Sequence, residues 1–488
     1  MTIRTLKYDL LKLLTALVLL PMATACGLVR DDYDIDEKPS GTRYINLTLY
    51  VNSDGRSVTR APQGGENGDG REAGLAYENQ VSGITVILYK GTGIDDPQAK
   101  VDFVKYFPVT LITRADPGTP YSYDAAVTYQ PEARYTTGDQ VVAEDEIDFK
   151  GIYHALIIAN QNISGVCPKG TMISDIRDLT VENVYANTTP TNPWNAQQFV
   201  MTSERDATIN FSSISPHTKD GNENEMVYEV LQPLLIERLS ARIDYCTKGA
   251  TYDASLGGYK YTSGDDVYVV TNVTPFNLYN GDEYLFKHVQ SDWTSDATIT
   301  YLGDESLVNY VVDPNTANKD NGDTNQPEYL SELDDFLNTT SPYKQNMVSV
   351  QSTSLFTESD GSVNVIIAYP KENTLMPGSY LMKYATGLAF EVNYYPGGTS
   401  NDPEKRVYYH YLRHQGELST GSYQAWQWND DEKDEEETSS SNEPIVSMNY
   451  GIVRNNIYRV SVGFTQERIN VYIKVKKWDP FAHEVIYM

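Results

Sequence analysis

Short stretches in which apolar and polar residues alternate are spread along the whole chain. Two of them lie near its ends, "RYINLTLYV" (residues 43–51) and "INVYIKVKKW" (residues 469–478). The first places four apolar side chains on one face: Ile45, Leu47, Leu49 and Val51. The second does the same with Ile469, Val471, Ile473 and Val475. A period of two predicts strands that bury one face, at roughly 1.5–3 kcal/mol for each buried side chain.

Similar patterns recur between these two stretches, separated by clusters of Gly, Asn, Asp and Pro. Examples are "GITVILYKG", "YHALIIANQ", "LAFEVNYYP" and "GIVRNNIYRVSVGF". Tyr, a strand-forming residue, occurs 38 times. We therefore expect a mostly β protein made of β-sandwiches. Two stretches, "TMISDIRDLTVEN" and "NPWNAQQFV", are expected to be short helical or irregular insertions.

The length of 488 residues is too great for one small core. A polar stretch at residues 222–229 is followed by the apolar run "LQPLLIERLSARIDYC". We therefore expect a domain boundary near residue 230, with one β-sandwich domain at 61–230 and a second at 231–488.

A Gly-rich polar stretch, "NSDGRSVTRAPQGGENGDGREAG", follows the first predicted strand and contains Arg56, Arg60 and Arg71. A loop of this length without apolar periodicity indicates either a function or disorder. If the chain were cut in this loop, the first strand could leave while its groove stays exposed, and a C-terminal strand from a neighbouring molecule would fit that groove.

The N-terminus has the features of an export signal. Three basic residues precede the apolar run "LLTALVLLPMA" (residues 13–23), and small residues then precede Cys26 in "ATAC". Small residues directly before Cys resemble a lipobox, so we expect a lipoprotein signal peptide at 1–25 and a lipid on Cys26. The alternative is an ordinary signal peptide that is cleaved nearby. Residues 26–60 would then be a lipidated propeptide that carries the first strand.

Charge and cysteine content narrow the range of functions. The formal net charge is −29, which repels phosphate backbones and argues against nucleic-acid binding. The acidic stretch "DDYDIDE" resembles the surface-export tag of lipoproteins in Gram-negative anaerobes such as Bacteroidales. Only Cys167 and Cys246 follow Cys26, and we expect both to be small buried residues without a bridge.

We find no set of residues that predicts catalysis, a cofactor or a metal. The chain has no phosphate-binding Gly-rich motif and no nucleophile elbow, and "DPNTANKDNGD" does not fit a calcium loop. His410 and His414 in "HYLRH" are expected to be strand or surface residues. In "YQAWQW", core packing of Trp426 and Trp428 is favoured over a sugar-stacking platform. We therefore expect a protein that is not an enzyme.

The C-terminal part resembles the fimbrillins, the shaft subunits of type V pili in Bacteroidales. The stretches that carry the resemblance are "YGIVRNNIYRVSV" and "INVYIKVKKWDPFAHEVIYM", with a weaker match in "IERLSAR". The matching residues are Val453, Arg454, Asn455, Asn456, Tyr458, Val475, Trp478, His483 and Glu484. Together with the lipobox and the Arg-bearing loop, the resemblance covers both ends and the middle of the chain.

This resemblance implies a fold and a mechanism. The fold would be two tandem transthyretin-like β-sandwich domains with short helical insertions. An Arg-specific protease would cut after Arg60, or after Arg56, and release the first strand with its lipid anchor in the outer membrane. A strand from residues 469–488 of another copy, including Trp478, would fill the groove by donor-strand exchange. The subunits would form a cell-surface fimbrium that serves cell adhesion.

One difference from the family concerns the linker before the last strand. Many members carry a long insertion there, whereas only "TQER" stands at residues 465–468 of this chain. An accessory, tip or anchor subunit is therefore an alternative within the family. A surface glycan-binding lipoprotein is an alternative of another class, and it would give Arg60 no role.

Overall fold

The computed structural model of the protein describes residues 42–51, 63–64, 71–72, 77–92, 96–113, 134–189, 192–203, 206–290, 299–301, 309–319, 347–350, 356–357, 361–375, 384–412, 426–427, 450–465 and 469–478. Cys26, Arg56 and Arg60 lie outside the described residues. Gly41–Met488 form one compact unit.

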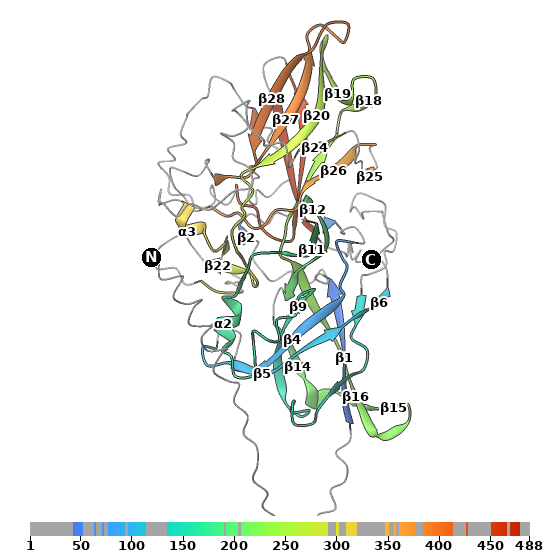
Figure 1. Cartoon of the computed structure of the whole chain (residues 1–488), viewed down its shortest axis with the longest axis vertical. Coiled ribbons are helices and arrows are strands. Elements are labelled where there is room, and N and C mark those ends of the chain that lie inside the picture. Colours follow the sequence, from blue (N-terminus) through green and yellow to red (C-terminus); the bar gives the residue numbers. More distant parts are fainter. Residues whose placement is uncertain are drawn as a thin grey trace, which may run out of the picture. The chain divides into compact units, whose positions relative to one another are not determined.

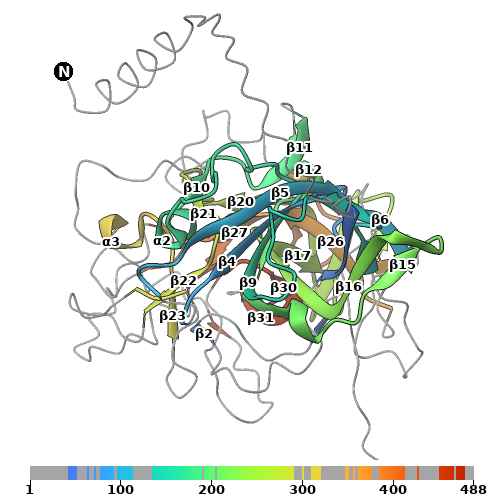
Figure 2. The ribbon, with the colours of Figure 1, turned by 90° about the horizontal axis from the view of Figure 1, so that it is seen from below.

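The largest sheet has eleven strands, and its N-terminal strand lies in the interior of the sheet. The path through the sheet is β5 (Lys100–Pro108), β4 (Gly83–Lys90), β9 (Ile152–Ala159), β13 (Met201–Ser203), β16 (Asn222–Arg238), β1 (Thr42–Val51), β7 (Arg134–Thr136) and β6 (Thr110–Thr113). Three more strands pair beside this path: β14 (Ala207–Asn210), β15 (His217–Lys219) and β8 (Gln140–Val142). Figure 2 shows β4 and β5 of this sheet side by side.

A second pair of sheets contains the C-terminal strands. The path of the seven-stranded sheet is β25 (Phe356–Thr357), β26 (Val363–Ala368), β17 (Arg242–Cys246), β30 (Asn456–Phe464), β31 (Ile469–Trp478) and β29 (Trp426–Gln427), and β3 (Arg71–Glu72) also pairs with β31. The path of the six-stranded sheet is β18 (Thr251–Asp253), β19 (Gly258–Ser263), β20 (Asp266–Phe276), β27 (Gly387–Tyr395) and β28 (Glu404–Tyr411), and β24 (Val348–Ser349) pairs with β20. Figure 1 shows β20, β27 and β28 side by side.

Smaller elements complete the described structure. The short sheets are β10 (Thr180–Val181) with β21 (Glu283–Tyr284), β11 (Tyr185–Thr189) with β12 (Asn192–Phe199), and β2 (Gln63–Gly64), β23 (Asn309–Val312) and β22 (His288–Gln290). The helical elements are α2 (Ile173–Arg177), α3 (Thr316–Lys319) and the 3-10 turn η1 (Phe211–Ser213). Within the described residues, no helix is long and apolar enough to cross a membrane.

Two large clusters of buried side chains form the cores. The first core draws on the eleven-stranded sheet and includes residues up to Leu239 along β16 and the segment that follows it. The second core begins at Ala241 and draws on both C-terminal sheets. There, Tyr245 packs edge-on against Phe390, with ring centroids 5.8 Å apart, so the seven- and six-stranded sheets face each other as a sandwich.

These observations confirm the mostly β architecture with β-sandwich packing, and they confirm a short helix, α2, inside "TMISDIRDLTVEN". The irregular or helical insertion expected at "NPWNAQQFV" is wrong, because this stretch forms β12. It pairs with β11 in a sheet of two strands, where both strands are edges and Pro193 is tolerated. Cys167 and Cys246 are both buried and form no disulfide, as expected.

Candidate assembly strands and the buried junction

Strand β1 has neighbours on both sides. It pairs with β16 in parallel over nine positions, from Thr42 to Val51, with an irregularity between Leu47 and Leu49. On its other side it pairs antiparallel with β8 and then with β7. The strand therefore closes the gap between two parts of one sheet, and its backbone partners lie on both edges.

The predicted apolar face of β1 lies in the first core. Ile45 and Leu47 are 2% exposed and Leu49 is fully buried. Opposite Leu47 and Leu49 on β16 lie Val230 and Leu234, which belong to the same core. At roughly 1.5–3 kcal/mol each, the three buried β1 side chains stabilise the fold by about 5–9 kcal/mol. The side chain of Val51 lies outside the described residues.

The other face of β1 is more covered than its polar residues suggest. Tyr44 and Thr48 are both buried. The Tyr44 hydroxyl donates to Glu225 at 3.2 Å, and the Lys219 ammonium lies 3.8 Å from the centre of its ring. The expectation of one solvated face is therefore wrong at these positions, and at Tyr44 the side chains of Glu225 and Lys219 contribute to the cover.

Strand β31 is held differently. It pairs antiparallel with β30 over nine positions, and Ile469 (1% exposed) and Val471 (3%) lie in the second core. Ile473 is partly buried against the same core. Val475 and Trp478 belong to the strand, but their side chains lie outside the described residues.

The outer edge of β31 is covered only near its ends by other described strands. Strand β29 pairs with Asn470 and Val471 at the beginning of β31. Strand β3 pairs in parallel with Lys477 and Trp478 at its end. Between these two contacts, no strand in the described part of the chain pairs with the outer edge of β31. β31 is therefore held by one long ladder on one side and by two short contacts on the other.

Glu78, which follows β3 in the sequence, belongs to a network of buried charged side chains. The Arg242 guanidinium donates twice to Asp244, at 2.9 Å each, and also to the Glu78 carboxylate at 3.0 Å. Asp244 accepts a further hydrogen bond from Arg459 at 2.9 Å. The Tyr369 hydroxyl donates to Glu78 at 2.5 Å. All of these groups are buried. The hydrogen bonds of Glu78 join it to Arg242 and Tyr369, two residues that lie far from it in the sequence.

Arg238 attaches the same turn by other contacts. Its Nε donates to the backbone carbonyl of Glu78 at 3.0 Å, and its Nη2 donates to the Asn79 side chain. Its Nη1 donates to Asn455 at 3.1 Å. Arg238 is completely buried, and the acceptors of these hydrogen bonds are a backbone carbonyl and two Asn side-chain oxygens. The turn at Glu78 and Asn79 is thus connected to β16 and to the residue before β30.

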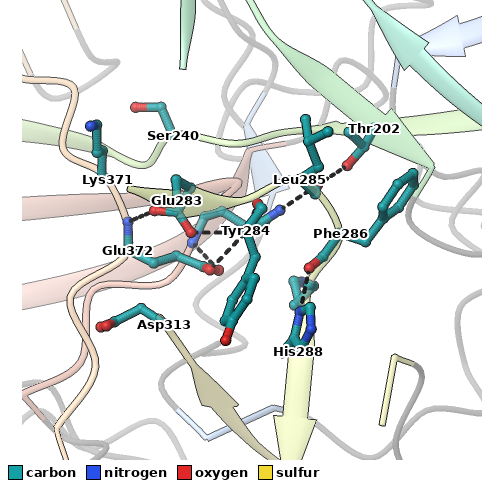
Figure 3. A network of polar contacts seen from close by, with 12 residues as sticks. Thr202, Ser240, Glu283, Tyr284, Leu285, Phe286, His288, Asp313, Lys371 and Glu372 are labelled. Carbon is teal, nitrogen blue, oxygen red and sulfur yellow. Dashed lines mark hydrogen bonds and ion pairs between the residues drawn. The ribbon is translucent and has the colours of Figure 1, made fainter. Parts of the chain in front are cut away.

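Arg454 forms a second buried cluster, with the carboxylates of Glu283 and Glu372. Its Nη2 donates to Glu283 at 2.9 Å and to Glu372 at 2.8 Å, and its Nη1 donates to the Leu285 carbonyl at 3.0 Å. Glu283 and Glu372 lie side by side in Figure 3, and the backbone N–H of Glu372 donates to Glu283 at 2.8 Å. All three charged side chains are completely buried.

Two carboxylates beside one guanidinium cannot both be charged at low cost. Burial, and then the neighbouring Glu372 carboxylate, raise the pKa of Glu283 well above its ordinary value. Burial also acts to raise the pKa of Glu372, but Arg454, a hydrogen bond with Glu283 and the charge of Lys287 together lower this pKa below its ordinary value. We infer that Glu283 holds the proton and Glu372 the charge, which leaves the cluster neutral.

The remaining candidate residues do not come together into a site. His410 is buried in β28, and His414 lies outside the described residues. Trp426 belongs to β29, whereas Trp428 lies outside the described residues. The described residues contain no group of three or more His, Cys, Asp or Glu placed to hold a metal ion.

We call the two networks of buried charged residues, around Glu78 and around Arg454, the junction. The sequence analysis quoted the arginines of the junction but predicted no role for them. Arg238 and Arg242 stand in "IERLSAR", and Arg454 and Asn455 stand in "VRNN". The available signal was that three arginines occur among apolar residues at predicted core positions. A buried Arg needs a partner, but the sequence does not indicate which distant carboxylate supplies it.

Comparisons with known proteins give similar structures but no related sequence. No family model matches the chain, and no curated protein matches it. The chain is similar to a candidate cell adhesion protein from Parabacteroides distasonis, with 12% identity over 91% of this chain and 100% of that one, at a TM-score of 0.40. It is also similar to the tip fimbrial protein Mfa3 from Porphyromonas gingivalis, with 8% identity over 90% of this chain and 100% of that one, at a TM-score of 0.38.

A further similar structure is a fimbrilin from Porphyromonas gingivalis W83, with 13% identity over 90% of this chain and 98% of that one, at a TM-score of 0.36. These structures are fimbrial and candidate cell adhesion proteins of Bacteroidales, the class of protein that the sequence resemblance indicated. At such identities and scores, the likeness assigns no role to any individual residue of this chain.

Proposed function

We propose that the protein is a structural subunit of a cell-surface fimbria, in which a strand from another subunit replaces β1. The observation that carries this proposal is the place of β1 in the chain and in the sheet. β1 lies between β16 on one side and β7 and β8 on the other. The stretch that follows it in the sequence contains Arg56 and Arg60.

Cleavage after Arg60 would turn β1 into part of a separate peptide that is held only by non-covalent contacts. Its departure would leave unpaired backbone groups on β16, β7 and β8, and it would expose core residues such as Val230 and Leu234. Such a groove is costly in water, because both its backbone groups and its apolar surface lose their partners. A strand with alternating apolar residues from another copy would restore both.

We place the donor strand within residues 469–488 of the neighbouring subunit. β31 repeats the apolar alternation of β1, and on the side away from β30 it is paired only at two short contacts, with β29 and with β3. Its long ladder to β30 and the burial of Ile469 and Val471 oppose this step. The new contacts in the acceptor groove are of the same kind, and they offset this cost.

Maturation and assembly would involve three partners: a lipid, a protease and other subunits. A lipid on Cys26 would anchor the precursor in the outer membrane, and an Arg-specific protease would release it. Other copies of the chain, or related subunits, would then bind on both sides.

We propose that the boundary between the two domains lies near residue 230, where the polar stretch at residues 222–229 ends. The second core begins at Ala241, and the first core also includes Leu285, Phe286, Tyr369 and Ile457 from later in the chain.

The test compares three forms of the precursor without its signal peptide. After treatment with an Arg-specific protease, the wild type should begin at Ala61 and give a ladder of multimers on an unboiled gel. Arg56→Ala with Arg60→Ala should stay uncut and monomeric. Arg71→Ala is the matched control, because it removes a nearby arginine and should leave cutting at Arg60 and the ladder unchanged.

Three results would contradict or redirect the proposal. A ladder from the uncut double variant would contradict strand replacement after cleavage. Clean trimming at Arg60 without any multimer would instead assign the protein to an accessory, tip or anchor role. No discrete cut at all would favour the surface glycan-binding lipoprotein.

A further inference from the structure

We propose that the donor strand enters the acceptor groove in one fixed register, in which Asn470 takes the place of Asn46. The partner is a second copy of this chain, and the inference rests on the proposed function, which it deepens. The groove would then recognise a particular polar residue on the face of the donor that points away from the core, in addition to its alternating apolar residues.

The first observation is that the two strands share a sequence motif as well as an alternation. Residues 45–51 read "INLTLYV", and residues 469–475 read "INVYIKV". In the same chain direction, both stretches begin with Ile-Asn and end with Val, and the third and fifth residues are apolar in both. Asn46 and Asn470 therefore occupy equivalent positions, directly after the first apolar residue of each stretch.

The second observation is the contact that Asn46 makes in the uncut chain. The hydroxyl of Thr136, on β7, donates to the Oδ1 atom of Asn46 at 2.7 Å. The same hydroxyl accepts a hydrogen bond from the backbone N–H of Gly138 at 3.1 Å, so its own proton is left for the strand. When β1 leaves, the Thr136 hydroxyl loses its acceptor. Asn470 brings an identical side-chain oxygen to the same position.

The third observation is that a shifted donor would bury a charge. A strand that keeps its apolar face towards the core can move only by an even number of residues. A shift by two residues in one direction places Glu467 at the buried position of Ile45. A shift by two in the other direction places Lys474 at the buried position of Thr48. Both shifts are costly, because a charged side chain would leave water.

A donor that entered in the reverse direction would keep the apolar row but lose the polar match. Lys474 would then lie at the position of Asn46, and a lysine offers donors but no acceptor to the Thr136 hydroxyl. The reversed strand would also run antiparallel to β16, with which β1 pairs in parallel over nine positions. The match at Asn470 therefore favours a donor that runs in the direction of β1.

One buried position changes size in this register, because Tyr472 replaces Thr48. The pairing of β1 with β16 is irregular at this point, between Leu47 and Leu49. A bulge interrupts the regular ladder, so the backbone there can adjust to the larger ring more easily than elsewhere in the groove.

Cysteine pairs between β16 and the donor test the register. Asn46 lies directly opposite Glu229, which is exposed, so Glu229→Cys is combined with Asn470→Cys, Tyr472→Cys or Lys474→Cys. Each precursor without its signal peptide is cut with an Arg-specific protease, left to form multimers, oxidised, and run on boiled, non-reducing gels. Covalent dimers should form with Asn470→Cys alone, because the other two positions lie too far from residue 229 for a disulfide. Glu229→Cys by itself is the control for dimers between exposed thiols.

The outcomes separate the register from the proposed function. Covalent dimers with Tyr472→Cys would show a shifted donor, and dimers with Lys474→Cys would show a reversed one. Either result, or multimers that give no covalent dimer with any of the three cysteines, would overturn the register and leave the proposed function standing. No multimer from the cut wild type would reject the proposed function, and the register with it.

Matched variants in the two strands test the asparagine contact. Asn470→Ala should make the multimers dissociate about tenfold faster in SDS at a fixed temperature, because one hydrogen bond is lost. Thr136→Val should have the same effect, and the double variant should show no further loss. Asn46→Ala is the control, because it removes the same contact from the uncut chain and should leave the multimers unchanged. Equal dissociation of Asn470→Ala and wild-type multimers would overturn the role of Asn470.

Discussion

Strands β1 and β31 carry the same alternating apolar pattern, but the structure holds them in different ways. β1 is an interior strand with partners on both edges, and three of its side chains lie in the first core. β31 has one long ladder, to β30, and only two short contacts on its other side. The departure of β1 would leave a groove between two parts of one sheet, whereas the departure of β31 would unpair only two residues each of β29 and β3 on its outer side. The first geometry suits an acceptor site and the second suits a donor.

The largest expected effect comes from removing β31 altogether. Deleting residues 469–488 removes Ile469 and Val471 from the second core and the partner strand of β30. We expect the uncut precursor to lose its cooperative thermal transition for that core. Deleting only residues 479–488 leaves every described strand in place, and the unfolding free energy should change by about 1 kcal/mol or less. Equal melting of the two truncated proteins would show that β31 is not needed for the core.

The second-largest effect is expected at the charge cluster of Arg454. This residue lies just before β30, the strand that pairs with β31. Glu283→Gln or Glu372→Gln alone should cost about 1 kcal/mol, because the remaining carboxylate can carry the charge that Arg454 needs. The double variant leaves Arg454 buried without a counter-ion and should cost roughly 3–5 kcal/mol. Urea unfolding of the four proteins measures this, and additive single effects would contradict a shared charge.

A substitution in each strand distinguishes the precursor from the fibre. Leu47→Ala in β1 should destabilise the uncut precursor by about 2–5 kcal/mol, because Leu47 is buried in the first core. The assembled fibre should be indifferent to it, since β1 is absent there. Ile469→Ala, a change of similar size in β31, should destabilise both forms. Thermal melting of precursor and fibre gives the answer, and a fibre weakened by Leu47→Ala would mean that β1 stays in place.

The smallest expected effect is a pH dependence of the unfolding free energy that arises from Glu283 and Glu372, the carboxylates that bind Arg454 just before β30. The folded protein raises the pKa of Glu283, so its contribution to stability is complete below about pH 4.5 and is lost as the pH rises through the folded value. The lowered pKa of Glu372 acts only in the acid range. Between pH 5 and 9, Glu283→Gln should therefore gain stability relative to the wild type. His288, whose pKa burial lowers, is common to both proteins and cancels in the difference.

Local pattern was enough to predict the strands themselves. The period of two placed β1 and β31 correctly and indicated that Ile45, Leu47, Ile469 and Val471 face a core. It could not tell an interior strand from an edge strand, because that depends on partners elsewhere in the sequence. For the same reason the burial of Tyr44 was missed, and β12 was expected to be irregular.

The ion pairs of the junction could not be predicted from the sequence, because the two partners of each pair lie far apart along the chain. Glu78 and Arg242 are 164 positions apart, and Glu283 and Arg454 are 171 apart. No local period links such residues, and burial of arginine and glutamate runs against their ordinary preference for the surface. The processing residues Cys26, Arg56 and Arg60 lie outside the described residues, so their roles remain predictions from sequence.

The most direct test of strand replacement is the composition of the multimer. The precursor without its signal peptide is cut with an Arg-specific protease, and the ladder is isolated without boiling and analysed by peptide mass spectrometry. Peptides from β1 should be absent, whereas those from β16 and β31 should be present in equal amounts. One copy of β1 for each subunit would contradict the account, because the groove that it proposes would still be filled by the subunit's own strand.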